Sequence, residues 1–456
     1  MNLKLSNFSS LNYLRSFKKT NLCRFIFYIC IAIIFYYFMK TYSPLGINWR
    51  PYHYERVLNS IKNIFENSSL SLLGYTSWAD VKDVKNHIQQ NTEKIYIVPI
   101  YTYAFSSLLY KIFGNFQFLN FAYIADYIFI VITGIFISEV GCKTIRLKNN
   151  VDSLFYGPVI FSLFLTSPWT YRMMIAPWYE VAFLGFYIFS IYLFIRNFKY
   201  AGLAFLSLSV LVSWIWGFFL FLFLILFLGI SLMNKNFFNN NFNFKYLPNS
   251  LQDKKGFYLY SSACCIPLGL NVLPLLIYRF VGIETSNSTA LFRIGLNNLE
   301  NIHHGGLLGA FQFLGGNRYS LCFKFDNLYQ VSNLDNIISI FNCSLSITSL
   351  VLLSLLSIFG LFLLLKNSSK IRWIFLPLIW SFLFYNFIFQ QSFAAHLQGH
   401  SYVFGLIFSI GLTYLIKYSF ELFKIPDVLS KVLMIPLITG IIVNSIRVDY
   451  ITGLNG

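Results

Sequence analysis

Charged residues are scarce in this chain of 456 residues: they make up 11% of it, whereas 57% of the residues are hydrophobic. Soluble domains are typically about 25% charged. Long runs such as FIFYICIAIIFYYFM (25–39) and GFFLFLFLILFLGISLM (217–233) carry no charge at all. Because roughly 20 apolar residues cross a bilayer as a helix, we predict an all-α polytopic membrane protein. Short alternating strands are missing, which excludes a β-barrel.

Metal and nucleotide motifs are also missing. The seven cysteines have no metal-ligand spacing. His396 and His400 are spaced i, i+4, which could suit a metal, but no nearby acid completes such a site. No Walker or dinucleotide pattern implies ATP or NAD. The sequence therefore leaves the cofactor unknown, and a divalent metal is possible but not indicated by ligand spacing. Cys322 and Cys343 could form a disulfide if both face an oxidising compartment.

The net charge of +17 does not indicate a nucleic-acid partner. Lys and Arg cluster in the short segments between apolar runs, and such clustering orients a chain in the membrane, with the basic segments in the cytoplasm. Residues 1–24 are basic and precede an apolar run without a convincing cleavage site. We therefore expect an uncleaved signal anchor, a cytoplasmic N-terminus and an active side on the extracytoplasmic face.

Charge parity then predicts about 11 transmembrane helices in one domain over 1–456. Residues 95–113 are apolar, but a crossing there would place the basic loop 142–150 outside, so we expect a surface or re-entrant helix. Two large outer loops, 42–116 and 282–341, should form a cap over the membrane domain. The predicted spans are 24–41, 117–140, 153–168, 178–195, 200–216, 217–233, 257–281, 342–365, 372–390, 400–417 and 429–446.

The stretch after the first span, INWRPYHYERVLNSIKNIFEN (47–67), concentrates ionisable side chains. As a helix, residues 53–66 gather their apolar side chains within about 120° and place Glu55 on the opposite side. His53 and Arg56 share one flank, since positions i and i+3 are neighbours. The pattern predicts an amphipathic helix on the outer membrane surface. It either merely exposes its polar face to water or carries residues that meet the head group of a lipid-linked substrate.

Other polar side chains fall on the same predicted side. All six histidines do so, and Arg172 and Glu180 flank a turn between two spans. An acid at the mouth of a span is costly without water or a partner, which makes Glu180 a functional candidate. Glycine pairs beside basic residues permit close approach to an anionic group. The candidates for binding substrate are His53, Arg56, Arg172, Glu180, His303, His304, Arg318, His396 and His400.

Three stretches within residues 1–235, taken in order, carry a resemblance to a known family. The first is the N-terminal span followed by a large loop with the His53-to-Arg56 step. The second is IYIVPIYTYAFSSLLYKIFGNFQFLNFAYIADYIFIVITGIFISEVG (95–141), and the third is IAPWYEVAFLGFYIFSIYLFIRN (175–197). Together they resemble the GT-C superfamily of membrane glycosyltransferases, in particular the protein-mannosyltransferase and aminoarabinose-transferase type. The C-terminal half is compatible with that family but carries no specific motif of it.

The resemblance implies transfer of a sugar from a polyprenyl-phosphate donor to an extracytoplasmic acceptor. In that family an acid in the first outer loop, usually Asp, serves as the base or orients the acceptor. The corresponding place here reads GINWRP (46–51) and has no acid, so Glu55 and Asp80 are the nearest candidates for the catalytic role. The alternatives are a polysaccharide polymerase, a flippase for lipid-linked sugars, or a membrane assembly or sensor protein without catalysis.

Overall fold

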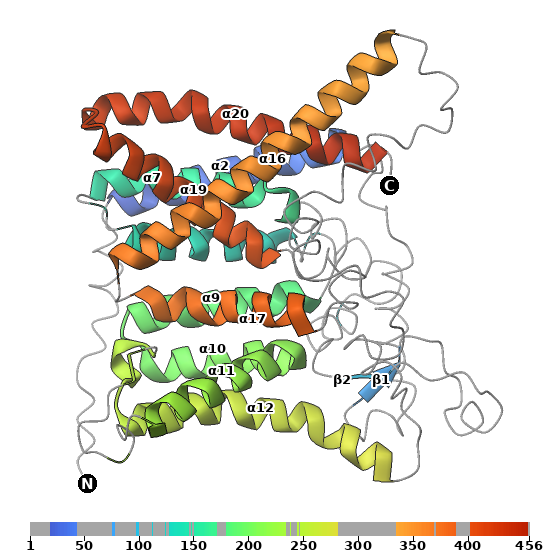
Figure 1. Ribbon diagram of the computed structural model, residues 1–456, viewed down its shortest axis with the longest axis vertical. Helices are drawn as coiled ribbons and strands as arrows, with labels where there is room; N and C mark the ends of the chain where they lie inside the picture. The colour runs from blue at the N-terminus through green and yellow to red at the C-terminus, as the bar shows by residue number, and fades with distance from the viewer. Residues whose placement is uncertain are drawn as a thin grey trace, which may run out of the picture.

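The computed structural model describes residues 19–42, 75–77, 97–99, 127–145, 150–170, 179–233, 247–280, 334–368, 371–388 and 402–454, with isolated positions between them. The described chain is almost entirely helical (Figure 1). Besides a helix over Tyr127–Thr144, the helices are α2 (Lys19–Tyr42), α7 (Asn150–Leu165), α9 (Tyr179–Ile195), α10 (Lys199–Val212), α11 (Trp214–Met233), the 3-10 turn η2 (Asn249–Leu251), α12 (Lys254–Phe280), α16 (Leu334–Asn367), α17 (Arg372–Ile388), α19 (Tyr402–Leu422) and α20 (Asp427–Leu454).

The prediction of a helical multi-pass membrane protein is confirmed in its coarse form. Within the described residues, six helices are long and apolar enough to cross a bilayer: the Tyr127–Thr144 helix, α11, α12, α16, α19 and α20. Shorter apolar helices lie in α2, α7, α9 and α10. Every predicted span overlaps a described helix, whereas the number of crossings stays a prediction.

The expected surface helix over 95–113 is wrong at residues 97–99. These residues form strand β2 (Ile97–Pro99), which pairs antiparallel with β1 (Tyr75–Ser77), Tyr75 lying opposite Pro99. β-Branched Ile97 and Val98 favour extended backbone, and Pro99, which has no N–H to donate, stands at the strand end. The remainder of 95–113, apart from Ile112, lies outside the described residues.

The helices form two groups (Figure 1). α2, α7, α16, α19 and α20 pack together in one group, and α9, α10, α11, α12 and α17 in the other. The Tyr127–Thr144 helix joins them, since the ring of Phe136 packs on Phe189 of α9 at 4.5 Å, while Gly134 lies against Phe161 and Phe164 of α7. Each group thus contains helices from both halves of the sequence.

The tightest helix contact in the first group is a seam of small residues between α16 and α19. A Cβ added to Gly360 would collide with the carbonyl of Gly411, and one added to Gly411 would collide with the carbonyl of Ser357. Side chains larger than hydrogen would therefore force the two backbones apart. Such close packing of small residues is what associates helices in lipid, where apolar surface gains little from leaving the solvent.

In the second group, α10 and α11 form a hairpin with one non-helical residue, Ser213, between them. A Cβ on Gly217 would lie 2.5 Å from Val210, so glycine allows the hairpin to close. The last carbonyls of α10 lack partners within their own helix. The buried amide of Asn271 on α12 donates to two of them, those of Val210 and Leu211, at 3.2 and 3.1 Å.

Two ion pairs connect helices that are distant in sequence. Arg24 of α2 lies 2.7 Å from Glu139 of the Tyr127–Thr144 helix. Lys431 of α20 bridges Asp152 of α7 at 2.6 Å and Asp427 of its own helix at 2.7 Å. These pairs lie at the same end of the bundle, near the first turns of α2, α7 and α20.

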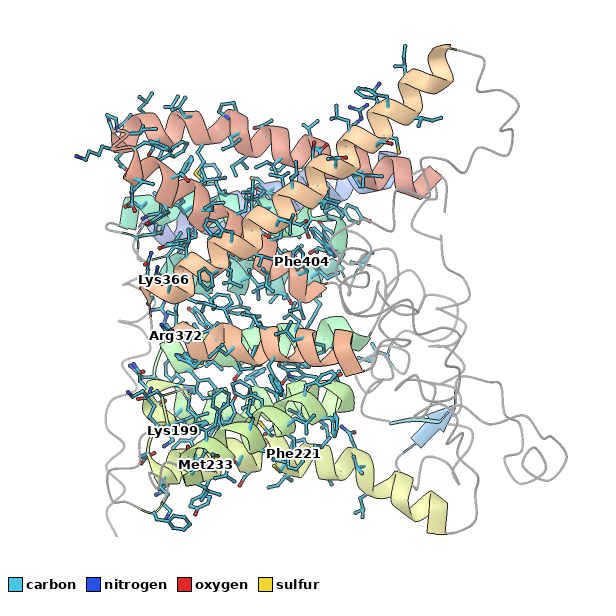
Figure 2. The ribbon with its side chains drawn as sticks, in the orientation of Figure 1. Lys199, Phe221, Met233, Lys366, Arg372 and Phe404 are labelled. Atoms are coloured by element: carbon cyan, nitrogen blue, oxygen red, sulfur yellow. The ribbon has the colours of Figure 1, made fainter. Side chains whose placement is uncertain are left out.

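The two ends of the bundle differ in charge and in the length of their connections. At one end, where Figure 2 shows Lys199, Lys366 and Arg372, most consecutive helices are joined by short segments, and the segment 234–253 between α11 and α12 is the long one. We call this end the basic face and define it by the cations Lys143, Arg196, Lys199, Lys366, Arg372 and Lys424. The opposite end, called the loop face, is where the segments 43–126, 171–178, 281–333 and 389–401 join their helices (Figure 1).

Candidate functional site

The residues predicted to form the site belong to segments that leave the bundle at the loop face. His53, Glu55, Arg56 and Asp80 belong to 43–126, Arg172 to 171–178, His303, His304 and Arg318 to 281–333, and His396 and His400 to 389–401. All ten lie outside the described residues. Glu180 occupies the first turn of α9 at the same face, and its side chain is not described. The site itself therefore stays a prediction.

The described residues nearest to these segments form a buried polar cluster where α7 meets α19. The hydroxyl of Ser167 lies 2.9 Å from that of Thr170 and 3.0 Å from the carbonyl of Phe164. Gly405, in the first turn of α19, faces both hydroxyls: an added Cβ would lie 2.7 Å from Thr170 Oγ1. Because no side chain intervenes at Gly405, the end of α7 and the start of α19 are in direct contact.

Aromatic side chains fix this contact. Trp169 is 3% exposed and packs edge-on against Phe404 at 4.6 Å and beside Phe408 at 5.3 Å. Buried aromatic pairs of this kind contribute about 0.5–1.5 kcal/mol beyond the area that they bury. The chain on either side of the contact thus emerges from a rigid base.

A second aromatic group lies between α9 and α11, where the first turn of α11 packs against the first half of α9. The ring of Phe183 stacks on Trp216 at 5.0 Å, and Tyr187 meets Trp216 edge-on at 4.9 Å. The Tyr187 hydroxyl donates to the carbonyl of Ile374 at 3.3 Å and so ties α9 to α17. The indole N–H of Trp216 is buried and has no hydrogen-bond partner among the residues that the structure describes.

The sequence reasoning missed the ionic contacts at the basic face. Arg24 donates to Glu139 at 2.8 Å, and the hydroxyl of Tyr28 donates to it at 3.4 Å. Gly157 of α7 makes room for them, because an added Cβ would lie 2.5 Å from the Tyr28 hydroxyl. The sequence did offer a signal for Glu139, because it is an acid at the end of an apolar run. It could not reveal the partner, Arg24, which lies 115 residues away.

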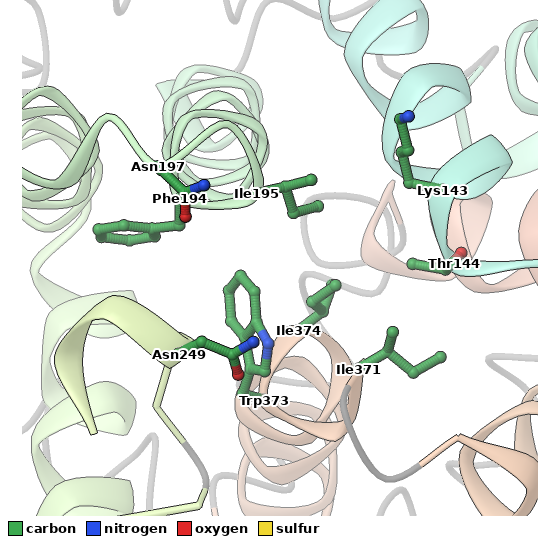
Figure 3. A pocket seen from close by; sticks show the side chains of 9 residues that line it. All are labelled: Lys143, Thr144, Phe194, Ile195, Asn197, Asn249, Ile371, Trp373 and Ile374. Carbon is green, nitrogen blue, oxygen red and sulfur yellow. The ribbon is translucent and has the colours of Figure 1, made fainter. Parts of the chain in front are cut away.

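A cavity of about 190 Å³ opens at the basic face. Its wall combines the last residues of the Tyr127–Thr144 helix and of α9 with η2 and the start of α17, and Figure 3 shows their side chains around the opening. The polar lining residues are Lys143, Thr144, Asn197, Asn249 and Trp373, and the apolar ones are Phe194, Ile195, Ile371 and Ile374. Sequence reasoning placed no site at this end of the molecule.

The described residues contain no group of three or more His, Cys, Asp or Glu that could hold a metal ion. Cys343 in α16 is disulfide-bonded, while Cys23, Cys30, Cys142, Cys264 and Cys265 are free thiols. The predicted partner, Cys322, lies outside the described residues.

Comparison of the chain with known protein families, curated proteins and solved structures finds no match.

Proposed function

We propose that this chain is an integral membrane glycosyltransferase of GT-C type, which moves a sugar from a polyprenyl-phosphate donor to an extracytoplasmic acceptor. One observation carries the proposal. The segments that contain the predicted site residues all join their helices at the loop face, away from the basic face (Figure 1). Residues separated by more than 300 positions in sequence can therefore contribute to one outer site.

The contact between α7 and α19 supports a shared site. Thr170 and Gly405 touch, Arg172 follows Thr170 by two residues, and His400 precedes Gly405 by five. Two cations at that place would stabilise the phosphate leaving group as the bond to the anomeric carbon breaks. The acceptor hydroxyl then needs a carboxylate to take its proton, and we assign that role to Glu55 or Asp80.

A flippase is the weaker alternative. A transport path through the membrane should display ionisable side chains at mid-depth. The described charges that pair between helices, Arg24 with Glu139 and Lys431 with Asp152, instead lie in the end turns at the basic face. Apart from the neutral amide of Asn271, and Asp152 at the basic face, the buried side chains of the described residues are apolar or carry a hydroxyl group.

Two features support the orientation that we propose. Of the Lys and Arg residues that the structure describes, all but Lys40, Arg279 and Arg447 lie toward the basic face, and such segments stay in the cytoplasm. α16 has 34 residues, about 51 Å of helix, so it exceeds the ~30 Å hydrocarbon core. Its disulfide-bonded Cys343 stands in the first third, toward the loop face, and disulfides persist in oxidising compartments. We therefore assign the loop face to the extracytoplasmic side.

Catalysis is tested with Glu55→Gln and Asp80→Asn, each assayed in membranes for transfer from a polyprenyl-phosphate sugar at matched protein levels. Loss of the base should lower the rate about 10²–10⁴-fold. Glu66→Gln, on the polar side of the same predicted helix, is the matched control and should retain activity. If both variants transfer sugar at the parental rate, neither acid is the base; if the parental chain transfers none, the non-catalytic alternative holds.

Topology is tested by cysteine labelling from each side of the membrane. Lys85→Cys should react only from outside, and Lys255→Cys, at the basic end of α12, only from the cytoplasm. Cytoplasmic labelling at position 85 would reverse the assigned orientation and exclude an extracytoplasmic site in the first loop.

A further inference from the structure

The polar groups around the cavity at the basic face are suited to an anion. The lining offers the ammonium of Lys143, the amides of Asn197 and Asn249 and the indole N–H of Trp373, and it contains no carboxylate. The hydroxyl of Thr144 is occupied, since it donates to the carbonyl of Gly141 at 2.8 Å. Lys143 stands at the rim of the opening (Figure 3).

The helix end that carries Asn197 satisfies its own carbonyls with backbone N–H groups. Asn197 has a φ of 62°, and the N–H of Phe198 closes back on the carbonyl of Leu193 at 2.9 Å. This is the arrangement in which a left-handed residue ends a helix and satisfies its last carbonyls. At the opposite wall, Ile371 directly precedes α17 and Trp373 lies in its first turn, whose N–H groups and positive dipole end favour negative charge.

The charge around the cavity is also positive. Glu139 is the nearest acid on the Tyr127–Thr144 helix, and it interacts electrostatically with Arg24, Arg196 and Lys143. It is paired with Arg24 at 2.7 Å, and among the described residues no ion pair joins Lys143 or Arg196 to an acid. Arg196 adjoins the lining residues Ile195 and Asn197, and its guanidinium rests over the ring of Tyr192 at 5.3 Å.

The size and place of the cavity select the kind of anion. Pockets for drug-sized ligands measure about 300–1,000 Å³, so 190 Å³ suits a single phosphate group better than a nucleotide. Phe194, Ile371 and Ile374 add apolar wall beside the donors. Basic pockets between helices at the membrane surface are where lipid head groups bind.

We propose that this cavity binds the phosphate group of an anionic phospholipid from the leaflet at the basic face. Lys143 supplies the charge, Asn197 and Asn249 donate hydrogen bonds, and the apolar wall contacts the glycerol and the upper acyl chain. The site lies at the end of the bundle opposite to the proposed catalytic site and does not depend on glycosyl transfer. Free phosphate presents the same chemistry, and the experiment separates the two sources.

The test is native mass spectrometry of the purified full chain in detergent, titrated with phosphatidylglycerol or with phosphatidylcholine. We expect one tightly retained phosphatidylglycerol per chain and weaker retention of phosphatidylcholine. Lys143→Ala should weaken the retention about five-fold, since one cation near a lipid surface contributes about 1 kcal/mol, and Lys143→Arg should preserve it. Asn197→Gly keeps the positive φ, removes the amide and should also weaken binding about five-fold.

Lys255→Ala is the matched control, because it removes an exposed charge from the same face without touching the cavity. If Lys255→Ala weakens binding as much as Lys143→Ala does, the lipid senses only the overall surface charge and the proposal is wrong. It is equally wrong if both lipids bind alike. If millimolar inorganic phosphate displaces the lipid, the site recognises the phosphate alone. If the lipid is retained, its glycerol and acyl parts are needed for binding. Either result supports the anion site.

Discussion

Replacing Glu139 with Gln should destabilise the helix bundle more than replacing its partner, Arg24, with Gln. The two side chains are 15% and 11% exposed and lie 2.7 Å apart. Glu139→Gln leaves Arg24, Lys143 and Arg196 without the acid that interacts with all three. Arg24→Gln, by contrast, leaves Glu139 with two cations among its electrostatic neighbours. The two variants therefore differ in their expected loss of stability, although each removes one charge.

The size of the effect follows from burial. Removing one partner of a buried ion pair costs about 3–5 kcal/mol, because the other charge is left uncompensated. We expect Glu139→Gln to fall in this range. Arg24→Gln should cost about 1.5–3 kcal/mol, which is the contribution of hydrogen bonds to a charged group. The double variant should cost less than the sum of the two single variants, with a coupling of about 1–3 kcal/mol.

The assay is unfolding of the purified chain from mild detergent by added dodecyl sulfate, followed by tryptophan fluorescence and far-ultraviolet circular dichroism. Glu421→Gln is the matched control, since it removes the exposed partner (49%) of an i, i+4 pair with Lys417, and helix pairs of this kind contribute about 0.3–0.5 kcal/mol. The reasoning would be refuted if Glu139→Gln unfolded with the control, or if Arg24→Gln cost as much as Glu139→Gln.

Three further changes are measured by the same titration. Asn271→Ala leaves the last carbonyls of α10 unsatisfied and should cost about 1–3 kcal/mol; an unchanged midpoint would show that water or lipid replaces the amide. Gly411→Val drives a side chain into the carbonyl of Ser357 and should prevent α16 from packing on α19, whereas Gly440→Ala, in open space on α20, should be neutral or slightly stabilising. Lys424 has a φ of 53°, so Lys424→Gly should stabilise the chain by about 1 kcal/mol, and a lowered midpoint would contradict this.

The positions of the helices could be predicted from the sequence, because an apolar run marks the part of a helix that lies in the hydrocarbon core. The ends are less well determined, as α16 illustrates. Its predicted span, 342–365, is the apolar part of a helix that extends over Leu334–Asn367. The first turns contain Asp335 and Asn336. Hydropathy does not predict these turns as part of the helix, because a helix that projects beyond the hydrocarbon core no longer needs apolar side chains.

The strand pair was beyond local sequence reasoning. Residues 95–113 have the composition of a surface helix, yet residues 97–99 pair with Tyr75–Ser77, some 20 positions earlier. Pairing of that kind depends on a partner that local periodicity does not reveal. The predicted site residues could be gathered on one side by charge parity alone, whereas their mutual distances depend on how the loops fold.

The contacts between helices were equally hidden. Nothing in an apolar run shows that Gly360 will meet Gly411 or that Arg24 will meet Glu139. The cavity at the basic face joins four elements that are separate in sequence. Its donors are common surface residues, so only their convergence in three dimensions makes them a candidate site.

The division of the bundle into two groups has a consequence for biogenesis. α7 enters the membrane early, but its polar end at Ser167 and Thr170 is covered by α19, and α9 is covered by α17 through Tyr187. At ~5–20 residues per second, the ribosome needs on the order of tens of seconds to synthesise the intervening chain. During that time the hydroxyls of Ser167 and Thr170 lack the cover that α19 later provides. The nascent protein therefore presents a surface on which an insertase or a membrane chaperone could act until the C-terminal helices arrive.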